Sequence, residues 1–360
     1  MNLIHAKTLT HARPSDRRAA EPLSRACFWV RTAAGPSIGF GHLRRTLALA
    51  SMLENVAEPC FLVDSDDFWT RREAGDRGWK CIEFRPDQPW SCSGSVPALI
   101  LIDTRQEEGL LAMIREARRR GVGVASIHDL GLNPVPSDVG IDGSVSPDFG
   151  DNGPAKAYTG LRYLVLDCSY GVEARFPKLI RQKLQTIVVN LGGGDSSRYF
   201  LKVLKGLLLW DRDVEVVGIR GFVSWGQDQL RAGDWRPLRF RWAERDEPLP
   251  ELLRNADLAI TAGGLSAFEA LCSGTPLMAL SYDVHQHRTV SALAKAGLCV
   301  DLQCGETLEP QRIPGLVAAL EKDQSLRQKM SLVGRRMVDG KGAERVRRIL
   351  QRLMSAAAQK

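Results

Sequence analysis

The feature that most constrains the fold of this 360-residue chain is a regular alternation of short apolar runs with helical patterns. Apolar runs between polar segments are typical of buried strands, and strands separated by helices build parallel sheets. The first series of predicted strands covers residues 27–30, 60–63, 81–84, 98–102, 122–127 and 163–167. The second series covers residues 186–191, 214–219, 238–242, 258–261 and 276–280.

Two such series predict an α/β chain with two doubly wound, Rossmann-like domains that face a central cleft. A chain of this length also exceeds one ordinary core and fits two domains of roughly 150 residues each. We expect a polar extension over residues 1–25, a first domain over 26–175 and a second over 176–360, with the final helix packing back on the first domain. Ligands of such sheets bind at the carboxyl ends of the strands, so we expect the site in the cleft.

Composition narrows the class of function and the compartment. The net charge of +7 is modest, and the chain has no zinc-finger spacing and no aromatic-basic sheet motif, so we expect no nucleic-acid partner. No apolar run reaches the ~18 residues of a membrane span, and residues 1–25 lack the apolar core of a secretory signal. Several of the eight cysteines lie in apolar runs, as reduced, buried cysteines do. These features predict a cytoplasmic protein and leave its oligomeric state open.

The first motif is a glycine-rich loop, residues 35–41, between the first predicted strand and a helix. It contains Gly39 and Gly41 and is followed by His42 and Arg45, which are three apart and therefore share one side of the helix. Free N–H groups and the helix dipole favour phosphate at such a helix start, and a histidine can transfer protons near neutral pH. The alternative is a packed histidine beside a connecting loop, and the segment alone favours neither.

Two further glycine turns follow strands of the second half. The first contains Gly193, Gly194 and Asp195, and it suits a phosphate or a plain strand-to-helix connection. The second lies in residues 257–276, which read in order as a strand, a glycine turn, a short helix and a Gly-x-Pro stop. We expect its N–H groups to face a diphosphate, from Gly263, Gly264, Leu265 and Ser266. Glu269, about one turn into the helix, can accept hydrogen bonds from both hydroxyls of a ribose.

Acidic residues also follow two strands of the first half. Asp103 and Asp129 come directly after apolar runs and therefore point to the same cleft. Asp103 suits a helix N-cap as well as a catalytic role. Arg105 can contact a phosphate or a sugar carboxylate, although a solvated arginine is its default state.

On these motifs the chain resembles the UDP-sugar hydrolases of the pseudaminic acid pathway (the PseG type) and, more distantly, GT-B nucleotide-sugar glycosyltransferases such as MurG. The resemblance spans about residue 26 to the C-terminus. It rests on residues 38–42 with Arg45, Arg31, residues 192–195, 260–269 and 274–276, Gln286, and residues 296–297. It implies a GT-B-like fold, UDP bound by the second domain, and a cytoplasmic role in making a cell-surface polysaccharide sugar.

The resemblance also implies roles for individual residues. His42 would be the catalytic base, with Asp103 and Arg45 beside it, and Glu269 the ribose ligand. The nucleotide pocket would be lined by Gly193, Gly194, Asp195, Gly263, Gly264, Leu265 and Ser266. On the sugar side of the cleft we expect Arg31, Gly39, Gly41, Arg105, Asp129, Phe268 and Gln286. UDP is a good leaving group, and helix starts with arginines can neutralise its phosphates, so we expect neither a cofactor nor a metal ion.

Three positions depart from the hydrolase pattern, and all are expected on the sugar side of the cleft. Ala33 replaces an aspartate, Arg105 stands where a tyrosine is usual, and Phe268 replaces an asparagine. The leading hypothesis is hydrolysis of a UDP-activated amino or deoxy sugar with His42 activating water. The departures keep two alternatives open, which are a glycosyltransferase that uses a sugar acceptor and a nucleotide-sugar binding protein without turnover.

Overall fold

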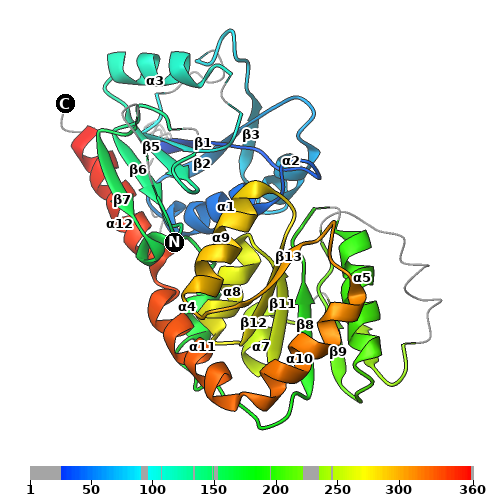
Figure 1. The fold of residues 1–360 in the computed structure, drawn as a ribbon. Helices are drawn as coiled ribbons and strands as arrows, with labels where there is room; N and C mark the ends of the chain where they lie inside the picture. Colours follow the sequence, from blue (N-terminus) through cyan, green and yellow to red (C-terminus); the bar gives the residue numbers. More distant parts are fainter. Residues whose placement is uncertain are drawn as a thin grey trace, which may run out of the picture.

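The computed structural model describes residues 26–357 except 91–95, 107, 133, 148, 150–152, 195, 222–234 and 245. The predicted N-terminal extension therefore lies outside the described residues, as does Asp195. Within the described part, two parallel sheets with flanking helices form the upper and lower halves of Figure 1. The helices of this part include none long and apolar enough to cross a membrane.

The first sheet has seven parallel strands in the order β3-β2-β1-β4-β5-β6-β7. These are β1 Cys27–Thr32, β2 Glu58–Val63, β3 Lys80–Glu83, β4 Leu99–Asp103, β5 Gly123–His128, β6 Val139–Asp142 and β7 Lys156–Thr159. Its early helices are α1 Gly41–Leu53, α2 Phe68–Gly75 and α3 Leu110–Arg119. The strand order reverses between β1 and β4, and such a switch point opens a crevice at the carboxyl ends of the strands.

The second sheet has six parallel strands in the order β10-β9-β8-β11-β12-β13. These are β8 Thr186–Asn190, β9 Glu215–Gly218, β10 Arg239–Trp242, β11 Leu258–Ala262, β12 Leu277–Ser281 and β13 Val300–Cys304. The helices of this half are α4 Cys168–Glu173, α5 Ser197–Leu209, α7 Leu249–Asn255, α8 Leu265–Ser273, α9 Val284–Lys295, α10 Ile313–Lys322 and α11 Gln324–Met337. The short 3-10 turn η2 Pro310–Arg312 packs on α5 and α10, whereas η1 Leu161–Tyr163 packs on β6 and β7 of the first sheet.

The segment between the two sheets contradicts one predicted strand. Residues 163–167 end the 3-10 turn η1 and then run to the start of α4 without pairing in a sheet. Their apolar side chains are buried all the same, because Val165 packs into the core of the first sheet while Leu164 and Leu166 pack into a core of the second. The apolar run therefore marks a crossing between two cores.

The last helix, α12 Gly342–Ala357, crosses back to the first sheet. It contacts α1, β4 and β5, and in Figure 1 it runs in red along the side of the upper half. Its residues Val346 and Leu350 are fully buried in the core of the first sheet. Gly342 starts the helix where a Cβ would lie 1.9 Å from the carbonyl oxygen of Leu164, so only glycine fits. The chain thus joins the two halves at two places.

Candidate active site

A cavity of about 510 Å³ lies where the carboxyl ends of the two sheets face each other. Its volume falls in the range of pockets that hold small molecules and cofactors. From the first half it is lined by Pro36, Ser37, Ile38, Gly39, Phe40, Gly41, His42, Arg44, Arg45, Arg105, Asp129, Leu130, Ser144 and Leu164. The second half contributes the loops after β8, β9, β11 and β12.

The glycine-rich loop closes on itself before α1 begins. Gly35 N–H donates to the carbonyl of Gly39 (3.3 Å) and Gly39 N–H to the carbonyl of Gly35 (2.7 Å). Gly39 has a φ of +87°, a conformation that glycine adopts without strain. The folded loop starts α1 at the wall of the cavity, with His42 in its first turn.

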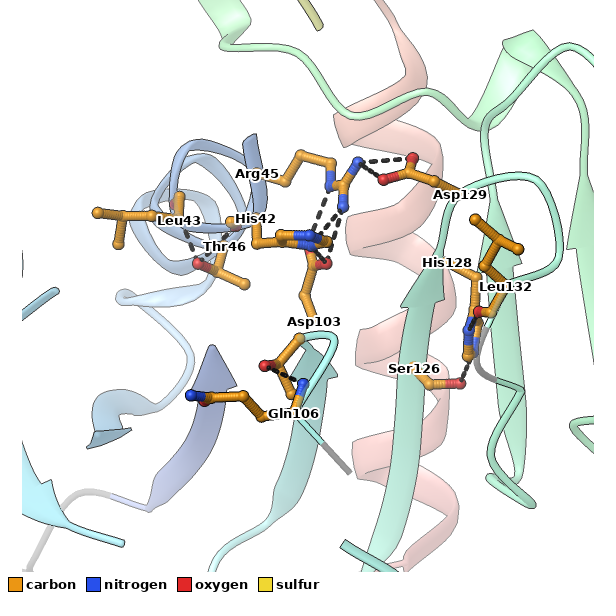
Figure 2. Close-up of polar contacts among 11 residues, drawn as sticks. His42, Leu43, Arg45, Thr46, Asp103, Gln106, Ser126, His128, Asp129 and Leu132 are labelled. Atoms are coloured by element: carbon orange, nitrogen blue, oxygen red, sulfur yellow. Dashed lines mark hydrogen bonds and ion pairs between the residues drawn. The ribbon is translucent and has the colours of Figure 1, made fainter. Parts of the chain in front are cut away.

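His42 is held by a buried carboxylate. Its Nδ1 lies 2.6 Å from Oδ1 of Asp103, whose side chain is fully buried. Asp103 also accepts two hydrogen bonds from Arg45, from Nε (2.9 Å) and Nη2 (2.8 Å), as Figure 2 shows. A carboxylate accepts hydrogen bonds, so Nδ1 of His42 is the donor in this pair, and Nη2 of Arg45 lies 3.0 Å from the same Nδ1. Nε2 of a neutral His42 is then an acceptor, as a general base requires.

Arg45 connects this pair to a second carboxylate. Its Nη1 donates to both oxygens of Asp129, at 2.8 and 2.9 Å, and the cluster lies at the top of Figure 2. Burial by itself would lower the pKa of Arg45, but the attraction of Asp103 and Asp129 outweighs burial and raises it. Burial would raise the pKa of Asp129, and the charges of Arg45 and His42 lower it instead. Arg45 therefore stays charged and fixes both carboxylates.

The lowered pKa of Asp129 predicts a loss of stability in acid. A carboxylate with a depressed folded-state pKa contributes stability above its ordinary value of 3.8 and loses it as the pH falls through the folded-state pKa. We expect the melting temperatures of the wild type and Asp129→Asn to converge as the pH is lowered from neutral to about 3. A difference that stays constant over this range would show that Asp129 is not stabilised by charge.

His128 is the last residue of β5, and its ring is held by neighbouring residues of the first half. Its Nδ1 lies 3.1 Å from the carbonyl of Leu132 and its Nε2 lies 2.7 Å from Oγ of Ser126 (Figure 2). Burial lowers the pKa of His128. The ring is engaged by its own loop and strand, and His128 is not among the residues that line the cavity.

Arg31 was expected to bind the sugar, but it is not among the residues that line the cavity. Its side chain is buried near the carboxyl end of β1, where Nη2 donates to Asp64 (2.8 Å) and to Gln106 (3.1 Å). The guanidinium also lies 4.3 Å from the centre of the Phe84 ring. Arg31 thus joins neighbouring strand ends within the first half, and its expected contact with the sugar is not supported.

The glycine turns of the second half border the cavity as expected. Gly193, Gly194 and the turn at residues 263–266 all line it, together with Phe268 and Gln286. A Cβ on Gly263 would lie 2.5 Å from Val290 and 2.8 Å from the carbonyl of Gln286, so this turn packs tightly on α9. A Cβ on Gly194 would lie 3.2 Å from the carbonyl of Pro36, which places the glycine loops of the two halves against each other.

Glu269 also departs from expectation, because it lies behind the cavity wall. It is 2% exposed, and its Oε1 accepts a hydrogen bond from Nη1 of Arg44 at 3.1 Å. Arg44 lines the cavity in its place. Arg44 could not be singled out from the sequence, because its partner Glu269 is 225 residues away along the chain.

Several other cavity residues were not predicted from the sequence. Tyr199 of α5 stacks on Tyr282 at 4.7 Å between ring centres, and the Tyr282 hydroxyl donates to the carbonyl of Leu191 (2.8 Å). The other lining residues of the second half that were not predicted include Arg198, Ile219, Arg220, Thr289 and Glu306. Tyr282 and Arg220 each follow closely after a strand, which is the signal that could have indicated them.

Two parallel Rossmann-like sheets that face one ligand-sized cavity define the GT-B glycosyltransferase-like fold, as the sequence predicts. MurG from Acinetobacter baumannii superposes with a TM-score of 0.63 at 15% identity, covering 91% of this chain and 99% of that structure. At this identity the likeness shows the fold alone.

Comparisons of the sequence find relatives that match only part of this chain. No family model matches the chain. The spore coat polysaccharide biosynthesis protein SpsG of Bacillus subtilis (strain 168) is 31% identical over 216 residues, which are 59% of this chain and 63% of that protein. The uncharacterized glycosyltransferase MK0977 of Methanopyrus kandleri is 29% identical over 168 residues, 46% of this chain and 44% of that protein. The chain thus matches less than two thirds of the length of these relatives.

Proposed function

We propose that this protein hydrolyses a UDP-activated amino or deoxy sugar at the anomeric C–O bond. The observation that carries the proposal is the His42–Asp103 pair, with 2.6 Å between Nδ1 and Oδ1, at a cavity that also holds the glycine turns of the second half. Nε2 of His42 accepts a proton from water as the water oxygen bonds to the anomeric carbon. The C–O bond breaks, and its electron pair leaves with the β-phosphate of UDP.

The second half is suited to hold the nucleotide. Gly264, Leu265 and Ser266 at the start of α8 lie at the cavity wall, and the free N–H groups of a helix start favour a diphosphate. The N–H of Gly263 was also expected to face the diphosphate, but it donates to the carbonyl of Leu280 (2.8 Å). Glu269 lies behind the cavity wall, paired with Arg44, and its carboxylate can accept the ribose hydroxyls once Arg44 releases it. Arg220 adds a positive charge at the cavity. This placement leaves the sugar beside His42, Arg105 and Asp129.

The likeness to glycosyltransferases supports transfer to a sugar acceptor as the second candidate. The same cavity would then admit a hydroxyl where the hydrolase admits water, and Arg105 and Phe268 are changed residues at its wall. The name of the SpsG relative, a spore coat polysaccharide biosynthesis protein, supports a role for either reaction in polysaccharide biosynthesis.

The two reactions are separated by incubating the wild type with a panel of UDP-sugars, with and without candidate acceptors. We expect UDP and free sugar in equal amounts without any acceptor. UDP release that depends strictly on an acceptor would instead establish a transferase. UDP binding without cleavage of any UDP-sugar in the panel would indicate a nucleotide-sugar binding protein without turnover.

A further inference from the structure

One ion pair joins the two halves directly at the cavity. Arg44 of α1 donates from Nη1 to Oε1 of Glu269 in α8 over 3.1 Å. The side chain of Arg44 is 45% exposed and lines the cavity, whereas that of Glu269 is 3% exposed. The guanidinium therefore lies between the cavity and a buried carboxylate.

The buried end of this pair has a second neighbour, the hydroxyl of Tyr170 in α4. Burial, the charge of Glu269 and a hydrogen bond to Glu269 raise the pKa of Tyr170 well above its ordinary value, so this hydroxyl stays neutral beside the carboxylate. The carboxylate of Glu269 thus has one charged partner at the cavity, Arg44, and a ligand that supplies hydroxyl donors can replace it.

Arg44 also belongs to the helix that carries the proposed base. It lies two residues after His42 and next to Arg45, which holds Asp103. Arg44 therefore lies on the same first turns of α1 as the residues that position His42.

We propose that Arg44 is a positioning residue that pairs with Glu269 in the nucleotide-free protein. When a nucleotide binds, the ribose hydroxyls replace Arg44 at the carboxylate of Glu269, and the guanidinium of Arg44 then contacts the diphosphate. This inference rests on the proposed function, since it assumes that a nucleotide enters the cavity. Arg44 then has opposite effects on the affinities for two ligands. It competes with the ribose of a nucleoside for Glu269, and it adds a favourable contact to the diphosphate of a nucleoside diphosphate.

Isothermal titration of uridine and UDP against the wild type and Arg44→Ala separates these effects. We expect the variant to bind uridine about tenfold more tightly and UDP more weakly, so that the advantage of UDP over uridine shrinks. The gain for uridine should disappear in Arg44→Ala/Glu269→Gln. Arg115→Ala removes an exposed arginine of α3 that does not line the cavity and should change neither affinity.

Arg44→Gln removes the charge but keeps a hydrogen-bond donor, and it should show the same pattern if the alanine variant folds poorly. Uridine affinity that is unchanged, or that falls by the same factor as UDP affinity, would overturn the role of Arg44. A wild type that does not bind UDP would overturn the proposed function instead, so the two failures are distinct.

Discussion

Replacing His42 by alanine is expected to slow UDP release from the cognate UDP-sugar by about 10²–10⁴-fold, the usual contribution of a general base. UDP affinity should change little, because His42 is proposed to contact the attacking water, whereas the loops of the second half and Arg44 are proposed to hold the nucleotide. The physical reason is that Asp103 fixes the tautomer of His42, so that Nε2 alone accepts the proton of water. Initial rates of UDP release and titration with UDP provide the two measurements.

His287→Ala is the matched control for this experiment. His287 lies in α9, is exposed, and is not among the cavity-lining residues, so its removal should leave the rate unchanged. Undiminished turnover in His42→Ala would exclude His42 as the base.

Replacing Arg45 by methionine is expected to cost about 3–5 kcal/mol of folding free energy. Methionine keeps much of the apolar volume but leaves the carboxylate of Asp103 buried without its cation. The side chains of Arg45 and Asp103 are 6% and 0% exposed, so solvent does not screen the lost interaction. Urea denaturation followed by circular dichroism measures the change.

The double variant Arg45→Met/Asp103→Asn tests whether the loss comes from the unpaired charge. Removing the carboxylate as well should restore part of the lost free energy, because residues in one ion-pair network are not additive. If Arg45→Met lost less than about 1 kcal/mol of folding free energy, the Arg45–Asp103 pair would be as weak as a surface ion pair. That result would contradict the expectation that Arg45 stabilises the buried carboxylate.

The two sheets were predictable because their central strands are buried on both faces. The run at 98–102 became β4 Leu99–Asp103, in which every residue is buried, and continuous apolar runs of this kind are characteristic of parallel sheets. β6, β7 and β13 were not predicted. β7 reads Lys-Ala-Tyr-Thr and is mostly exposed at a sheet edge, so its sequence lacks an apolar run. A strand at an edge carries little pattern of its own.

The site was predictable where the residues are local to a strand end. His42, Arg45, Asp103 and Asp129 come together because each follows a strand of the same sheet. The position of Glu269 was not predictable in the same way. Its surroundings depend on Arg44 of the other half, and the relative placement of two sheets is set by long-range packing such as that of α12.

The proposed reaction is tested most directly by turnover of the UDP-sugar in ¹⁸O-labelled water, which shows which product takes up the oxygen of water. Cleavage of the anomeric C–O bond, with His42 activating water, leaves the β-phosphate of the released UDP without ¹⁸O. Mass spectrometry should therefore show unlabelled UDP formed without an acceptor. Labelled UDP, or UMP with a sugar phosphate, would place the water attack on phosphorus and contradict the proposed reaction.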